Sequence, residues 1–117
     1  MGEFPELIDN RQQTEQALDS GDARRITSAL AQMIYFETDL RWLHDQYLHF
    51  LHYSDPQVRA LAAMKLGDIA LFHKKSESRA VAALKELLHD PEPSVADSAK
   101  EAIEMISYYV ADLNEDG

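Results

Sequence analysis

The stretch around residues 40–53 carries the side chains best suited to bind a metal. Asp45, His49 and His52 are spaced i, i+4 and i+7, which places three potential ligands on one face of a helix. Zinc could use a set of this kind. However, aromatic residues lie among the histidines, where imidazole packs well, and the glutamate-containing pattern of metalloproteases is absent. We therefore interpret the histidines as packing residues and expect neither a metal nor a cofactor.

Catalytic patterns are missing from the sequence. General acid–base catalysis needs carboxylates in a cleft that displaces their pKa values, whereas here the carboxylates fall mostly on helix faces expected to be exposed. The chain has no cysteine, no G-x-S-x-G motif and only four glycines, none of them in a phosphate-binding loop. The sequence therefore favours a protein that is not an enzyme.

The charge of the chain indicates which partners it can bind. The sequence has 21 acidic and 11 basic residues, and its formal net charge is −10. Between residue 86 and the end of the sequence there are nine acidic residues and one basic residue, Lys100. Phosphate backbones and anionic lipids need a positive surface, and no apolar run approaches the roughly 20 residues of a membrane span. We expect no direct nucleic-acid binding and no membrane association.

The last helical segment carries the best candidate binding surface. Five of its residues recur at i, i+4, i+7, i+11 and i+15 and form one stripe beside the apolar face: Asp97, Glu101, Glu104, Tyr108 and Asp112. A tyrosine among the charges is an anchor of the kind that interfaces favour. Two interpretations stay open, a partner-binding surface and a solvated helix face, because Asp97 and Glu101 also suit the dipole at the helix start.

A second, weaker candidate surface lies on the segment 40–53. Trp42, Gln46 and Tyr53 could meet a partner there. Aromatic residues at such positions more often belong to the core.

Helical periodicity extends along the whole chain and predicts an all-α fold, since no run alternates apolar and polar residues as a strand would. The helices are expected over 1–21, 22–36, 40–53, 56–73, 78–88 and 94–113. Their starting residues are typical N-caps: Asp22, Asp39, Ser54 or Asp55, Ser76 or Ser78, and Ser94. The segment 56–73 is apolar nearly all round, which predicts a helix buried on more than one side in the middle of the molecule.

An internal repeat supports this organisation. A shift of 37 residues brings the third and fourth expected helices onto the fifth and sixth; for example, Val58 falls on Val95 and Leu66 on Ile103. Residues 5–37 form a diverged first copy. Repeating helix pairs are the mark of a stacked array. We therefore expect residues 1–117 to form one domain, a short α-solenoid of about three antiparallel helix pairs over 5–37, 40–73 and 78–113.

The repeats resemble a known family. The segment Leu48-x-x-Leu51 and the following Asp55-Pro56-x-Val58-Arg59-x-x-Ala62-x-x-x-Leu66 look like a HEAT or HEAT-like repeat. The second copy, Leu84-x-x-x-Leu88-x-Asp90-Pro91-x-x-x-Val95, has Ala96 where the repeat usually carries arginine. HEAT repeats are general interaction scaffolds, so this resemblance implies a fold and not one function.

The short length, the acidity, the lack of cysteine and the helical repeats also resemble small bacterial immunity proteins, which bind and block the toxin domains of contact-dependent systems. That resemblance implies a cytoplasmic protein whose acidic stripe binds a basic toxin domain, such as an RNase. The absence of cysteine fits a reducing compartment. The alternative is a HEAT-like scaffold or adaptor for a larger enzyme or complex, and self-association through an apolar end is a third option.

Overall fold

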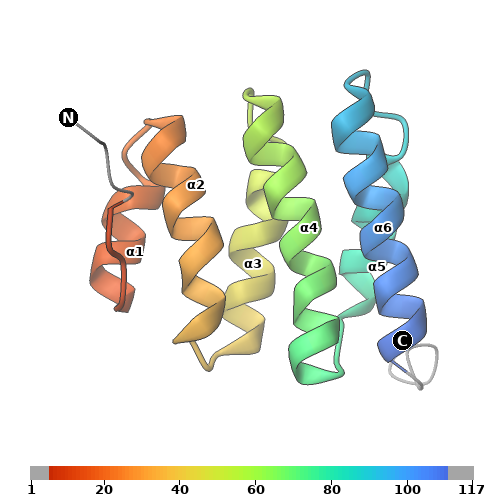
Figure 1. Ribbon diagram of the computed structural model, residues 1–117, viewed down its shortest axis with the longest axis horizontal. Helices are drawn as coiled ribbons and strands as arrows, with labels where there is room; N and C mark the ends of the chain where they lie inside the picture. Colours follow the sequence, from red (N-terminus) through yellow and green to blue (C-terminus); the bar gives the residue numbers. More distant parts are fainter. Residues whose placement is uncertain (1–5, 111–117) are drawn as a thin grey trace.

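The computed structural model describes residues 6–110, and every regular element in this range is helical (Figure 1). The elements are α1 (Arg11–Leu18), α2 (Ala23–Gln32), the 3-10 helix η1 (Met33–Tyr35), α3 (Leu40–Phe50), α4 (Pro56–His73), α5 (Ser78–Leu87) and α6 (Pro93–Tyr109). The prediction of an all-α protein is confirmed for the described range. Within it, no helix has the length and apolar content to cross a membrane.

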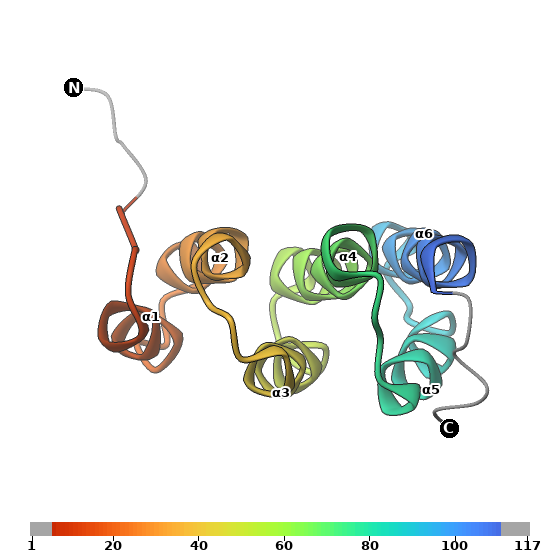
Figure 2. The ribbon, with the colours of Figure 1, turned by 90° about the horizontal axis from the view of Figure 1, so that it is seen from below.

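The helices lie in two layers. Figure 2 shows α2, α4 and α6 side by side in one layer and α1, α3 and α5 in the other. Helix α4 lies between α2 and α6 in its layer (Figure 1), and it also packs against α3. The core lies between the layers, where Tyr47 is fully buried and its hydroxyl donates to the carbonyl of Leu30 over 2.8 Å. The central position predicted for the segment 56–73 is therefore correct.

The aspartate caps form as predicted. The side chains of Asp22, Asp39 and Asp55 each accept a hydrogen bond from a backbone N–H in the first turn of α2, α3 and α4. The cap predicted at Ser94 is wrong, because α6 already begins at Pro93. Proline has the φ of a helix and lacks an N–H that would be unpaired there, so it suits the first helical position.

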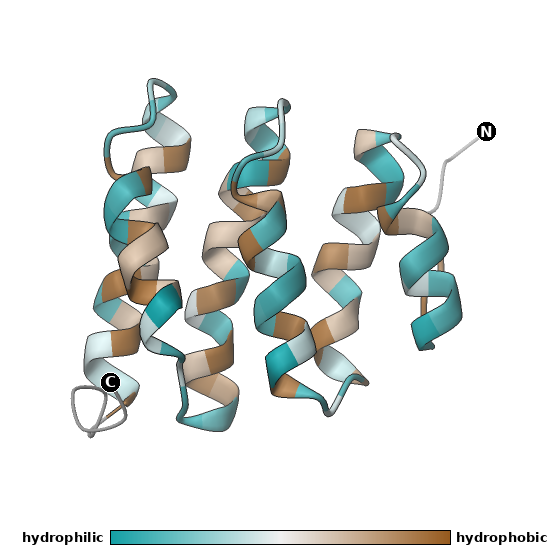
Figure 3. Ribbon diagram, turned by 180° about the vertical axis from the view of Figure 1, so that it is seen from behind, coloured by the Kyte–Doolittle hydropathy of each residue, from teal (hydrophilic) through white to brown (hydrophobic). Residues whose placement is uncertain are grey.

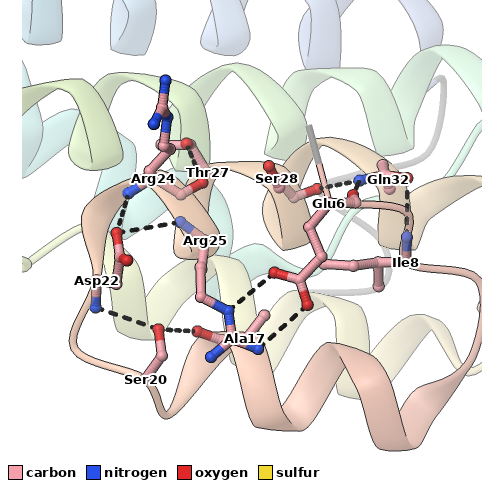
Figure 4. Close-up of polar contacts among 10 residues, drawn as sticks. All are labelled: Glu6, Ile8, Ala17, Ser20, Asp22, Arg24, Arg25, Thr27, Ser28 and Gln32. Carbon is pink, nitrogen blue, oxygen red and sulfur yellow. Dashed lines mark hydrogen bonds and ion pairs between the residues drawn. The ribbon is translucent and has the colours of Figure 1, made fainter. Parts of the chain in front are cut away.

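The first helix is shorter than expected. Helix α1 begins only at Arg11, because the side chain of Asn10 accepts the N–H of Gln13 and caps the helix there. Before this cap, Ile8 is buried and donates its N–H to the side-chain oxygen of Gln32 (Figure 4). The neighbouring Leu7 is 73% exposed. Helix α1 is hydrophilic over most of its length (Figure 3). The segment before it is held to α2 through Gln32, whose side chain accepts the N–H of Ile8 and donates to the carbonyl of Glu6.

Other helix ends also differ from the expectation. The helix expected over 22–36 tightens into η1 at Met33, and α3 ends at Phe50 rather than at residue 53. Helix α6 ends at Tyr109 rather than at residue 113, because Val110 is already extended. Helix α4 ends where predicted, and Lys74 after it adopts a left-handed conformation with φ 58°. The ammonium group of Lys74 donates a hydrogen bond to the carbonyl of Leu71. A cation at this position also interacts favourably with the negative end of the helix dipole.

One arginine ties three segments of the chain together. Nε and Nη2 of Arg59 lie 2.9 and 3.0 Å from the two carboxylate oxygens of Asp90, in the loop between α5 and α6. Nη1 of Arg59 donates to the carbonyls of Tyr53 and Ser54 before α4. The two side chains are only 15% and 8% exposed, and the guanidinium lowers the pKa of the Asp90 carboxyl below its usual value.

We expect Arg59→Met to lower the free energy of unfolding by about 2–3 kcal/mol, because it leaves the little-exposed Asp90 carboxylate without its charged donor. Urea denaturation would measure the change. Arg59→Lys keeps the charge but cannot form the two-pronged contact, so we expect it to recover less than half of the loss. If the lysine variant were as stable as the unaltered protein, the contact of two guanidinium nitrogens with Asp90 would not explain the stability that Arg59 provides.

Candidate protein-binding surface

The predicted stripe on α6 is exposed in the structure. Asp97, Glu101, Glu104 and Tyr108 all point away from the core, whereas the opposite side of the helix is buried through Val95, Ala99, Ala102 and Ile106. We call the four exposed residues the α6 acidic stripe. The fifth predicted residue, Asp112, lies outside the described residues. Between residues 6 and 110, none of the three carboxylates forms an ion pair, so their charges are available to a partner.

The stripe borders a shallow hollow, and one ring of its lining, that of Tyr109, already lies 4.4 Å (centroid) from the ammonium of Lys74. Glu101, Glu104, Met105, Tyr108 and Tyr109 line the hollow. The two tyrosine rings lie edge to face with centroids 4.8 Å apart, and Tyr108 is 81% exposed. Carboxylates beside an exposed aromatic ring offer an ion pair and a ring contact to the same lysine or arginine.

Helix α4 contributes an apolar surface that the sequence reasoning missed. Met64 is 46% and Phe72 is 49% exposed, and Leu61 and Leu71 are half-buried on the same side of the helix. We call these four residues the α4 ridge. The nearly uniform apolar character of the segment 56–73 is the available signal in the sequence, and it predicts burial on all sides. That interpretation is wrong for this side of the helix, because α2, α3 and α6 cover the other sides only.

Met105 joins the α4 ridge to the α6 acidic stripe. Its sulfur lies beside Gly67 of α4, and its side chain lines the hollow with Glu101 and Tyr108. On the other side of α4, the ring of Tyr35 lies 5.9 Å from that of Phe72. The apolar surface therefore continues from η1 across α4 to the acidic edge of α6.

The histidines occupy separate environments. Asp45, His49 and His52 are exposed, and Asp45 pairs with Arg79 of α5. His44 is buried instead: Nδ1 lies 2.8 Å from the carbonyl oxygen of Leu40, and Nε2 accepts the N–H of Glu77. Between residues 6 and 110, no group of three or more His, Asp or Glu side chains could hold a metal ion.

Two residues of the second candidate surface, Trp42 on α3 and Tyr53 just after it, make contacts within the protein. The guanidinium of Arg11 lies 3.8 Å from the ring centroid of Trp42, and Tyr53 packs against Phe50. Trp42, Gln46 and Tyr53 are all half-buried. These contacts favour a structural role for the three residues.

The buried His44 makes stability depend on pH. Burial lowers its pKa below the usual value, and the backbone of Leu40 and the carboxylate of Glu77 only partly oppose this. A histidine whose pKa is lowered by folding contributes its full stability above its unfolded pKa of about 6.5, and this contribution is lost as the pH falls from that value through the lower pKa of the folded state. We therefore expect the free energy of unfolding to decrease below about pH 6.5.

The test compares His44→Gln with His49→Gln, which removes an exposed histidine. The first variant is expected to lose less free energy of unfolding between pH 7 and 5 than the unaltered protein, by about 1.4 kcal/mol for each pH unit by which the pKa is lowered. Guanidinium denaturation at several pH values measures this loss. An unchanged pH dependence in His44→Gln would show that another group is responsible.

The exposed residues of α4 and α6 together define a surface with a charged part and an apolar part. No protein-family model, curated protein or solved structure matches this chain. The functional conclusion therefore depends on the chemistry of the surface itself: unpaired carboxylates, an exposed tyrosine and an adjoining apolar ridge.

Proposed function

We propose that this chain is a non-catalytic protein-binding module whose partner presents a basic surface. The observation that carries the proposal is the α6 acidic stripe, where Glu101 and Glu104 have no ion-pair partner within residues 6–110 and line one hollow with the exposed Tyr108. Opposite potentials speed association, and a few aromatic contacts determine the affinity. Such a module needs neither a cofactor nor a metal.

The same proposal includes the finer description of the fold. The pairs α1–α2, α3–α4 and α5–α6 are taken as three antiparallel, HEAT-like repeats of one short solenoid. The two-layer arrangement in Figure 2 supports this, as does the contact between Arg59 in the second pair and Asp90 in the third. Stacked repeats of this kind present extended surfaces to partners.

The resemblance to bacterial immunity proteins favours a basic toxin domain, such as a nuclease, as the partner in the cytoplasm. A carboxylate-rich surface would occupy the site where a nuclease holds the phosphates of its substrate. The alternative is a scaffold or adaptor for a larger enzyme or complex. The exposed α4 ridge is available to a partner of either kind, and it adds an apolar contact through Met64 and Phe72 to the electrostatic one.

The proposal is tested by purifying the tagged chain together with the protein encoded beside its gene, at about 50 mM and about 500 mM salt. A basic domain that is retained at low salt and weakened at high salt is the expected result, since salt screens exposed charges. A large complex retained equally at both salt concentrations would favour the adaptor. Failure to retain any basic protein at low salt would contradict the proposal.

A further inference from the structure

We propose that the α4 ridge and the α6 acidic stripe together form a docking site for an amphipathic, basic α-helix of the partner protein. This inference rests on the proposed function and adds the form and chemistry of the segment that binds. The apolar face of that helix would lie along α4, and its lysine or arginine side chains would reach Glu101 and Glu104 on α6.

Exposed apolar side chains gather on this surface. Within residues 6–110 six large hydrophobic side chains are exposed. Four of them, Tyr35, Met64, Phe72 and Tyr108, lie on η1, α4 and α6, and only Leu7 and Leu88 lie elsewhere. Single exposed apolar residues are ordinary on a protein surface, but a continuous patch indicates an interaction site.

The spacing along α4 fits a helical ligand. Leu61, Met64, Leu71 and Phe72 lie at i, i+3, i+10 and i+11, which aligns them along the axis on one side of the helix. Helix α4 has 18 residues and is therefore about 27 Å long. An amphipathic helix of similar length can place apolar anchors along such a ridge at its own i, i+3, i+4 and i+7 positions.

The charges on the two sides of the ridge determine the character of the ligand. Asp68 of α4, between Met64 and Leu71 in the sequence, is already paired with Lys65, whose ammonium lies 3.2 Å away. The carboxylates of the α6 acidic stripe have no such partner among residues 6–110. A neutral apolar helix would desolvate these carboxylates without compensation, whereas lysine or arginine along one edge of the ligand would pair with them.

The same charges argue against a second copy of this chain as the occupant. A two-fold symmetric contact uses the same surface of both copies. Such a contact would bring two α6 acidic stripes to one interface, where like charges repel. A basic helix from a different protein meets no such repulsion.

The probe for the test is a synthetic peptide of about 18 residues with leucine on one helical face and lysine on the other. Fluorescence anisotropy measures its dissociation constant. A peptide of the same composition in scrambled order removes the apolar face, and a leucine–glutamate peptide reverses the charge. We expect the amphipathic lysine peptide to bind at least about tenfold more tightly than either control peptide.

Two matched variants locate the site. Met64→Ser/Phe72→Ser removes the exposed part of the α4 ridge without changing the charge, and we expect at least about tenfold weaker binding. Leu7→Ser/Leu88→Ser removes the exposed apolar residues outside this surface and is expected to bind normally. Circular dichroism verifies that both variants are folded.

The outcomes separate this inference from the proposed function. A third variant, Glu101→Lys/Glu104→Lys, reverses the charge on α6. If it abolishes binding while Met64→Ser/Phe72→Ser leaves binding unchanged, the helix-docking inference is overturned and the acidic binding module stands. If the glutamate peptide binds as tightly as the lysine peptide, both are overturned. A dimer in sedimentation experiments that Met64→Ser/Phe72→Ser dissociates would identify a second copy as the occupant and overturn the inference.

Discussion

Glu101→Lys/Glu104→Lys is expected to weaken binding of the basic partner by about a hundredfold. The two substitutions replace attraction by repulsion at the hollow that Glu101, Glu104, Met105, Tyr108 and Tyr109 line, and like charges across an interface cost several kcal/mol. Because both carboxylates are exposed and lack an ion pair within residues 6–110, the fold should tolerate the change. Isothermal titration calorimetry at low salt measures the dissociation constant.

The matched control is Glu15→Lys/Glu86→Lys. These residues are exposed on α1 and α5, in the other layer, and the control changes the net charge by the same amount. If only total charge mattered, both double variants would lose the same affinity. Equal losses would therefore contradict a localised binding surface on α6, whereas a loss confined to Glu101 and Glu104 would support it.

Gly67→Val is expected to lower the free energy of unfolding by about 3 kcal/mol. A Cβ at residue 67 would lie 3.0 Å from the Cα of Ala102 and 3.2 Å from the sulfur of Met105. Met105 can rotate away, but the backbone of α6 can yield only if the two helices move apart. The γ-methyl groups of valine extend the conflict further into the contact, and chemical denaturation measures the resulting loss.

Ala82→Val serves as the control for Gly67→Val, since Ala82 is exposed on α5. It introduces the same β-branched side chain into a helix where nothing has to move, and should cost less than about 1 kcal/mol. Similar losses in the two variants would show that helix propensity, and not the close approach of α4 and α6, explains the effect of Gly67→Val.

Much of the fold could be predicted from local sequence signals. Asp22, Asp39 and Asp55 act as caps because a cap depends only on the residues of its own first turn. The exposure of Glu101 and Tyr108 follows from helical periodicity alone. The start of α6 is different. Pro93 suits the first position of a helix and Ser94 suits a cap, and the two signals are adjacent in the sequence. The structure uses Pro93, so the prediction of a cap at Ser94 is wrong.

The features that the sequence did not predict depend on neighbours distant in the chain. The contact of Arg59 with Asp90 joins residues 31 positions apart, and no local pattern specifies it. Hydrophobicity places α4 at the centre of its layer, but it does not tell which side of α4 remains uncovered. Only the arrangement of α2, α3 and α6 reveals that Met64 and Phe72 face outward.

The most direct test is a nitrogen-15 NMR titration of the labelled chain with the basic protein that co-purifies with it. The account predicts that the largest shift changes gather on the α6 acidic stripe and the α4 ridge, with Glu101, Tyr108 and Met64 among the most affected. Residues on the outer sides of α1, α3 and α5 should change little. Changes that gather on that second layer and leave α6 unaffected would contradict the binding surface described for this protein.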